Sequence, residues 1–247
     1  MAHLPAPTPG RVLLIIDQPV LAELLSFALN HGLFHTEVAS TAQDAVLTLE
    51  KRPPHLIIVD MDLAQGQMLD QLTETSQGNV RIPIVALTRR GNLKEKLDAF
   101  DQGVDDILTV PFSPEELVAR VVAVMRRSYG ANIAFTPTIR LGELEIDIFK
   151  RHVRAGTSEL HLTGLEQNLL YLLAANAGRL LTRGEILDAL WGADFIADSN
   201  VVDRHIRNLR IKLQDNWRRP RYIATVPGRG YRFVPTTADE TSAELSG

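Results

Sequence analysis

The chain has 247 residues, a length that suggests two domains of ordinary size. Its 45% hydrophobic and 23% charged content excludes disordered and fibrous classes, and the absence of cysteine excludes disulfides and thiolate metal sites. The net charge of −4 is unevenly spread: residues 1–127 hold 11 Lys and Arg against 16 Asp and Glu, whereas residues 198–234 hold 9 against 3.

The start of the chain, MAHLPAPTPG, has no basic segment before an apolar stretch and does not look like a signal peptide. The longest apolar runs, 12–16 and 56–59, are far shorter than the ~18 residues of a membrane-spanning helix. We therefore expect a cytoplasmic protein with no membrane partner.

Residues 10–127 alternate between short apolar runs and stretches of helical period. Strands are predicted at 12–16, 35–40, 56–60, 82–88 and 105–110, and the helices that follow them end near 29, 49, 76, 100 and 127. Five such units predict an α/β fold with a doubly wound five-stranded parallel sheet of the flavodoxin type, covered by helices on both faces. Ligands of such sheets bind at the carboxyl ends of the strands, where the sequence has Asp17, Asp60, Thr88 and Val110.

Asp17 and Asp60 fall at neighbouring strand ends. Two carboxylates and a backbone carbonyl there would suit Mg²⁺, and a carboxylate beside Mg²⁺ can accept a phosphoryl group. Acids at these positions also commonly end strands and cap helices, and the spacing alone does not separate the two interpretations.

Residues 128–137 show neither strand nor helix periodicity and contain Gly and Pro, which predicts a linker. Short extended pieces with turn signals between 138 and 162 then predict a small antiparallel sheet. Thr163 and Glu166 form a capping box that opens a helix through 175.

Two more helices and a hairpin complete the second domain, 138–235. One helix is expected from Thr182 to near Trp191, and the next from Ser199 or Asn200 to Leu213. The strands of the hairpin flank the turn PGRG within 222–234. The polar, acidic tail 236–247 is expected to be disordered.

The helix over 200–213 separates into two faces. Its apolar stripe consists of Val202, Ile206, Leu209 and Leu213, and its outer face carries Arg204, Arg207, Asn208 and Ile211. Arg bonds guanine, Asn bonds adenine and an aliphatic group contacts the thymine methyl, so the outer face suits the DNA major groove.

The cations around this helix extend the predicted contact with DNA. Arg210 and Lys212 would reach phosphates, and Arg229, between two glycines, would enter an adjacent minor groove. Arg218, with Arg219 and Arg221, enlarges the basic surface. The competing interpretations are a solvated basic helix and a protein-interaction module that binds no DNA.

Three segments of the second half carry a family resemblance. LLTRGEILDALWG (180–192), NVVDRHIRNLRIKL (200–213) and RYIATVPGRGYRF (221–233) resemble the winged-helix effector domain of OmpR/PhoB-type response regulators. The resemblance implies a winged helix-turn-helix α+β domain in which 200–213 is the recognition helix, the hairpin is the wing and 192–199 contacts RNA polymerase. Pro227 stands where such wings usually carry Arg, and Arg229 is the candidate replacement.

The resemblance extends to a receiver domain over 10–128. LIIVDMDL implies Asp60 as the phosphoacceptor of a partner histidine kinase, Thr88 as the hydroxyl that bonds the phosphoryl oxygens, and a Mg²⁺ site of Asp17, Asp60 and the Asp62 carbonyl. GVDDILTVPFSPEELVAR resembles the segment that follows Thr88.

Three positions depart from the receiver pattern. Ile16 replaces the first acid, Val110 replaces the lysine that pairs with the phosphoryl group, and Ile107 replaces the aromatic that changes rotamer with the hydroxyl residue. The first loss weakens Mg²⁺ binding, and the second removes a charge-assisted bond of ~1.5–3 kcal/mol. These departures predict a receiver that phosphorylation controls weakly or not at all, with no required cofactor.

Receivers of this family dimerise through the fourth helix, fifth strand and fifth helix. Charged residues that occupy those positions are Lys96, Asp101, Asp105, Asp106, Glu116, Arg120 and Arg127. The alternative interpretation is that they are solvated surface charges, each of which contributes little to stability.

These observations predict a sequence-specific DNA-binding transcription regulator, not an enzyme, that binds direct-repeat half-sites as a dimer. The alternative within this class is a conventional response regulator activated by phosphorylation of Asp60. A phosphate-ester hydrolase with Asp60 as its nucleophile is disfavoured, because Asp62 alone is a weak signal and Val110 is not a lysine.

Overall fold

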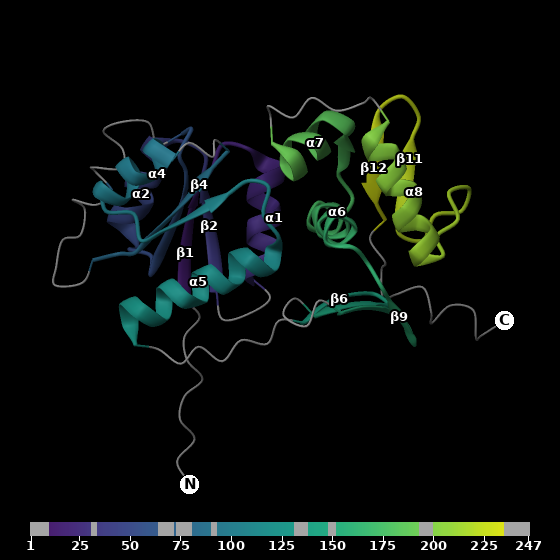
Figure 1. Ribbon diagram of the computed structural model, residues 1–247, viewed down its shortest axis with the longest axis horizontal. Helices are drawn as coiled ribbons and strands as arrows, with labels where there is room; N and C mark the ends of the chain where they lie inside the picture. The colour runs from purple at the N-terminus through teal and green to yellow at the C-terminus, as the bar shows by residue number, and fades with distance from the viewer. Residues whose placement is uncertain are drawn as a thin grey trace, which may run out of the picture. The chain divides into compact units, whose positions relative to one another are not determined.

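The computed structural model describes residues 10–30, 34–63, 72, 81–89, 93–130, 138–147, 152–192 and 200–234. The chain divides into two compact units, residues 1–136 and 137–247 (Figure 1). Within the described ranges, no helix is long and apolar enough to cross a membrane. Most of the helix predicted near 66–76, the segment 193–199 and the tail 236–247 lie outside the described residues.

The first unit contains the predicted five-stranded parallel sheet. Its strands are β1 (Gly10–Ile15), β2 (Phe34–Ala39), β3 (Leu56–Asp60), β4 (Ile84–Thr88) and β5 (Asp106–Thr109), in the order β2-β1-β3-β4-β5. All residues of β3 and β4 are buried, which explains why both strands are apolar up to their last residues, Asp60 and Thr88. The strand order reverses between β1 and β3, the place where ligands of doubly wound sheets bind.

Four described helices cover the two faces of this sheet. They are α1 (Pro19–Asn30), α2 (Ala42–Lys51), α4 (Leu93–Asp101) and α5 (Pro114–Tyr129). In Figure 1, α1 and α5 lie on one face and α2 and α4 on the other. Alternate strand residues such as Leu13, Ile57 and Ile84 form one core cluster with Ala45 of α2 and Ala99 of α4.

Helix α5 is longer than predicted. The Ser113 hydroxyl caps its first turn by accepting from the Glu116 N–H, but the helix continues past Arg127 and ends at Gly130, whose φ is 62°. The Tyr129 hydroxyl donates to the carbonyl oxygen of His55 at 2.9 Å. This bond ties the last turn to the start of β3, so Ser128 and Tyr129 belong to the helix and not to the predicted linker.

The second unit begins with the expected antiparallel sheet and continues with three helices and a wing. The sheet contains β6 (Thr138–Leu141), β7 (Leu144–Asp147), β8 (His152–Ala155) and β9 (Ser158–Leu160) in sequence order. It is followed by α6 (Gly164–Ala175), β10 (Leu180–Thr182), α7 (Arg183–Trp191), α8 (Val201–Leu213), β11 (Ile223–Val226) and β12 (Gly230–Phe233). This is the predicted winged helix-turn-helix arrangement.

Strand β10 was not predicted, because three residues are too few to show a strand period. It pairs with β12 and completes the sheet β10-β12-β11. Gly230 starts β12 directly opposite Thr182, and a Cβ added to it would overlap the carbonyl oxygen of Leu181. Glycine at this position therefore lets the wing close against the helical part of the domain.

Candidate functional site

Helix α8 has the two faces that its sequence predicts. Its four apolar residues, Val202, Ile206, Leu209 and Leu213, are at most 3% exposed. On the opposite face, Arg204, Arg207 and Asn208 are exposed, and Ile211 is 65% exposed. Ile211, in the last turn of α8, therefore does not pack in the core and is available on the same face as the two arginines and Asn208.

A polar network fixes the start of α8 against α7 and the wing. The Arg183 Nε and the Tyr231 hydroxyl both donate to Asp203 Oδ1 at 2.7 Å. The Arg183 guanidinium also lies 5.2 Å from the centre of the Tyr231 ring. Burial and the neighbouring Asp203 raise the pKa of Tyr231 to about 12, so the hydroxyl stays protonated as a donor.

Arg210, which was predicted to reach phosphates, contacts the wing in the folded domain. Its Nη2 donates at 2.7 Å to the carbonyl oxygen of Ile223 and to the hydroxyl of Thr225, both in β11. Its guanidinium lies 5.7 Å from the centre of the Tyr231 ring, and burial lowers the pKa of Arg210. The side chain joins α8 to the wing.

Lys212 is also engaged within the domain. Its Nζ donates to Glu166 Oε2 at 2.6 Å, and the Glu166 carboxylate accepts from the Thr163 N–H in the predicted capping box. Burial opposes ionisation of Glu166, but the bonds from Lys212 and Thr163 hold its pKa below the usual value. Lys212 therefore joins the end of α8 to the start of α6.

Buried Asp215 organises the turn after α8. Its carboxylate accepts from the backbone N–H of Arg221 at 2.7 Å and from that of Ile223 at 2.8 Å. Since Asp215 is 7% exposed and Ile223 begins β11, this side chain sets where the wing starts. The sequence analysis did not identify this residue.

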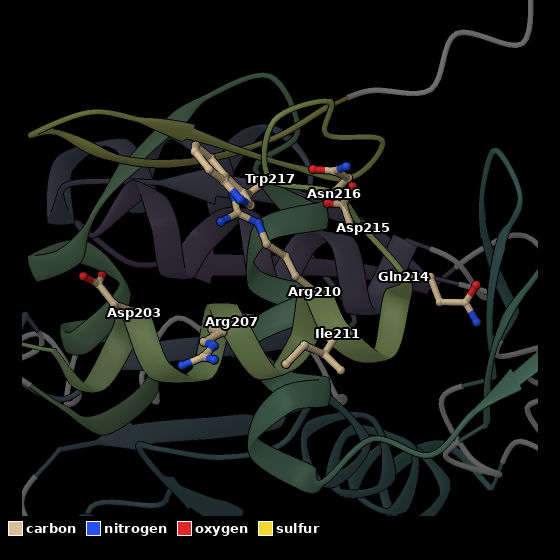
Figure 2. Close-up of a pocket in the computed structure, with 8 residues that line it drawn as sticks. All are labelled: Asp203, Arg207, Arg210, Ile211, Gln214, Asp215, Asn216 and Trp217. Atoms are coloured by element: carbon tan, nitrogen blue, oxygen red, sulfur yellow. The ribbon is translucent and has the colours of Figure 1, made fainter.

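A groove of about 450 Å³ runs between α8 and the segment after it (Figure 2). Arg207 and Ile211 line it from α8, and Trp217, which is 64% exposed, lines it from the following segment. The Arg218 guanidinium lies 5.2 Å from the centre of the indole ring. An exposed indole beside the predicted base-reading face adds apolar contact area that the sequence analysis missed.

The wing presents the predicted arginine at its tip. The N–H of Arg229 donates to the carbonyl oxygen of Val226 at 3.0 Å, and Gly228 has a φ of 69°. Pro227, Gly228 and Arg229 are all exposed. Pro227 is the second residue of this four-residue turn, and Arg229 is its accessible last residue.

In the first unit, Asp60 ends β3 and is 2% exposed. Its Oδ1 accepts from the Asp62 N–H at 3.0 Å, and its Oδ2 accepts from Arg89 Nη2 at 3.1 Å. Burial raises the pKa of Asp60, while the Asp62 N–H and the Arg89 charge oppose that rise. Thr88, at the end of β4, is 7% exposed.

The residues around Asp60 do not fit a Mg²⁺ site as they lie. Ile16 and Val110, 1% and 5% exposed, put buried aliphatic groups where the receiver pattern has an acid and a lysine. A guanidinium occupies one oxygen of Asp60 and lies 3.9 Å from the carboxylate of Asp62. In the described part of the chain, no three acidic, His or Cys residues form a metal-binding group.

The predicted dimer residues separate into engaged and accessible groups. Arg120 bridges Asp106 at 3.1 Å and Glu116 at 2.8 Å. Asp105 accepts from the Ile84 N–H at 2.8 Å, so it secures the start of β4. Asp101, Arg127 and the ion-paired Glu116 are exposed, while Lys96 donates to the Thr109 hydroxyl at 2.9 Å.

Helix α4 also exposes three apolar side chains one helical turn apart. Leu93 is 70% exposed, Leu97 54% and Phe100 46%. They lie on the helix that the resemblance places in the dimer interface, and an apolar stripe of this kind favours burial against another surface.

Comparison with known proteins matches both units. Residues 12–122 match the family described as "Response regulator receiver domain", and residues 157–233 match "Transcriptional regulatory protein, C terminal". The chain is 36% identical to the transcriptional regulatory protein TrcR of Mycobacterium tuberculosis, over 92% of this chain and 88% of that protein. It is 33% identical to the KDP operon transcriptional regulatory protein KdpE of Escherichia coli, over 90% of this chain and 98% of the relative. The phosphate regulon transcriptional regulatory protein PhoB of Escherichia coli is also 33% identical, over 90% of this chain and 97% of its own length.

Proposed function

Because this chain belongs to the OmpR/PhoB family of response regulators, whose members are DNA-binding transcriptional regulators and not enzymes, we propose that it reads a specific operator through α8 and the wing. The observation that carries this proposal is the exposed face of Arg204, Arg207, Asn208 and Ile211, which opposes a fully buried apolar stripe. Arg207 and Asn208 contact base edges in the major groove, and Ile211 contacts thymine methyl groups.

The surrounding cations position the domain on the backbone. Arg229 reaches the minor groove beside the recognition helix, and Arg218 with Trp217 lies along the sugar-phosphate backbone. Arg210 and Lys212 act indirectly, since their side chains fix α8 to the wing and to α6.

This assignment is tested with the full chain and an operator recovered by selection from genomic fragments. Arg207→Ala and Asn208→Ala should each weaken operator binding by ~1–3 kcal/mol and relax discrimination at one base pair. Arg154→Ala, at an exposed position of β8, is the matched control and should bind the operator as wild type does. Unchanged footprints for both variants would show that α8 does not read the bases.

We further propose that two chains bind direct-repeat half-sites and dimerise through α4, β5 and α5. The exposed leucines of α4 supply the apolar part of the interface, and the Asp106–Arg120–Glu116 cluster supplies charged contacts. Leu97→Asp should then lower the cooperativity of operator binding while leaving binding to a single half-site intact. Equal losses on single and double half-sites would contradict this interface.

The third part of the proposal is that phosphorylation of Asp60 controls this receiver weakly or not at all. Buried Ile16 and Val110 remove an acidic ligand and the phosphoryl-binding lysine. The alternative is conventional activation by a histidine kinase, with Asp60 as acceptor. Acetyl phosphate with Mg²⁺ decides between them: a shift to dimer on size exclusion that Asp60→Ala abolishes would establish the conventional switch.

One further partner and the cellular location are proposed from the family. Contact with RNA polymerase through residues 192–199 and action in the cytoplasm are expected of a regulator that works at promoters. Exchange of residues 193–199 for a Gly/Ser segment should abolish transcription activation in vitro while operator binding persists. Loss of both together would place this segment in folding or DNA binding instead.

A further inference from the structure

We propose that Arg89 is a built-in cation of the Asp60 site, which takes the place of a divalent metal and holds the acceptor carboxylate in a permanent ion pair. This inference deepens the proposed function, because it names the residue that maintains the receiver without phosphorylation. It is carried by the position of Arg89 in the structure, which the three sequence departures did not indicate.

The backbone places Arg89 within reach of Asp60. Strands β3 and β4 are parallel neighbours with Asp60 paired to Leu87, and Arg89 directly follows the last residue of β4, so it emerges at the same sheet edge as Asp60. The Arg89 Nη2 lies 3.1 Å from Asp60 Oδ2, and the two side chains are 14% and 3% exposed. The pair is therefore largely removed from water, and a charged group in such surroundings needs a partner of opposite charge.

Both oxygens of the acceptor are occupied within the chain. Asp60 Oδ1 accepts from the Asp62 N–H at 3.0 Å, and Oδ2 accepts from Arg89. The Arg89 Nε lies 3.9 Å from Asp62 Oδ2, so one guanidinium faces both Asp60 and Asp62. A metal ion or an incoming phosphoryl donor would have to displace this arginine first.

The same position supplies a cation where Val110 stands in place of the lysine of the receiver pattern. Arg89 provides the positive charge next to the buried Asp60 carboxylate. An arginine is suited to this role because it stays protonated and donates in a fixed geometry. The charge of Asp60 is thus paired within the chain, whereas a metal-dependent site requires a bound ion.

The experiment compares Mg²⁺ binding and thermal stability of the full-length wild type, Arg89→Gln and Arg89→Lys. Wild type should give no Mg²⁺ binding heat at roughly 10 mM, and its Tm should not respond to the ion. Arg89→Gln removes the competing charge, so it should have a lower Tm that Mg²⁺ restores, and should bind the ion at least ~10-fold more tightly. Arg89→Lys keeps a cation and should remain insensitive to Mg²⁺.

Two controls test whether the expected effects arise from the Asp60–Arg89 pair and not from the loss of any charged side chain. Arg126→Gln, an exposed arginine of α5, should change neither the Tm nor Mg²⁺ binding. Asp60→Asn should lower the Tm of wild type, because it leaves the Arg89 charge buried, but should not lower that of Arg89→Gln further. Additive effects of the two substitutions would show that the residues are not a pair.

The outcomes distinguish this inference from the proposed function. If wild type and Arg89→Gln are both inert to Mg²⁺ and to acetyl phosphate, the receiver is independent of phosphorylation but Arg89 is not the reason. If wild type binds Mg²⁺ and is phosphorylated as well as Arg89→Gln, both ideas are wrong. If wild type reacts and Arg89→Gln does not, Arg89 assists phosphorylation, and the inference is again overturned.

Discussion

Removal of the Asp215 carboxylate should destabilise the winged-helix domain and weaken DNA binding together. This side chain accepts two backbone N–H groups, those of Arg221 and Ile223, just where β11 begins. Asp215→Ala deletes both acceptors and leaves the domain core untouched.

The size of the effect follows from the surroundings of each donor. The N–H of Ile223 is buried, and an unsatisfied buried donor costs ~1–3 kcal/mol. The N–H of Arg221 is only partly buried, so water replaces much of its lost bond. We expect a loss of about 2–4 kcal/mol in unfolding free energy, which corresponds to a urea midpoint lower by roughly 1–2 M.

Tryptophan fluorescence measures this loss in one domain alone. Both tryptophans of the chain, Trp191 and Trp217, belong to the second unit, so their emission during urea unfolding reports that unit. Asp188→Ala, a half-buried aspartate of α7, is the matched control and should stay within about 0.5 kcal/mol of wild type. A loss below that limit for Asp215→Ala would refute the assignment of the carboxylate as the organiser of the wing.

Three further results are expected. Gly230→Ala should disrupt the pairing of β10 with β12, because its Cβ would overlap the Leu181 carbonyl, and should weaken operator binding at least ~10-fold in anisotropy titrations. Gly184→Ala on α7 is the control and should not weaken binding, because its Cβ would meet only the Thr182 hydroxyl, at an ordinary contact distance of 3.9 Å. The bond from Lys212 overcomes the burial of Glu166 and holds the pKa of this carboxyl below 4.5. The ionised carboxylate therefore stabilises the domain above this pH, and the stabilisation is lost as the pH falls through the lowered pKa. In Glu166→Gln, the unfolding free energy should decrease less steeply with falling pH than in wild type. Operator affinity should decrease linearly with salt on logarithmic axes, and a flat titration would argue against phosphate contacts.

The fold was largely predictable from local pattern. Buried parallel strands such as β3 and β4 are apolar at every position before the last, and Thr163 with Glu166 marks the start of α6 by a capping box that the structure confirms. The two faces of α8 follow equally directly from its period. These features depend on residues close in sequence, which is why sequence reasoning recovers them.

The parts that were missed depend on contacts between distant segments. Arg89 reads as the first residue of a loop, and only the pairing of β3 with β4 brings it to Asp60. Arg210 and Lys212 follow the cationic pattern of a DNA-binding helix, but their partners lie in β11 and α6. Sequence spacing shows which face a side chain occupies, whereas the acceptor that it meets there is set by tertiary packing.

The contacts among Arg183, Asp203, Arg210 and Tyr231 have a consequence for operator architecture. They join α7, α8 and the two wing strands before any DNA is bound. The conformational entropy of aligning α8 with the wing is therefore lost during folding and not during DNA binding. If Asn208 contacts the major groove and Arg229 the minor groove as proposed, the distance between these two contacts is set by the folded domain. A base pair inserted between those two contact points would cost the regulator one of them, while insertions outside a half-site would leave its own contacts intact.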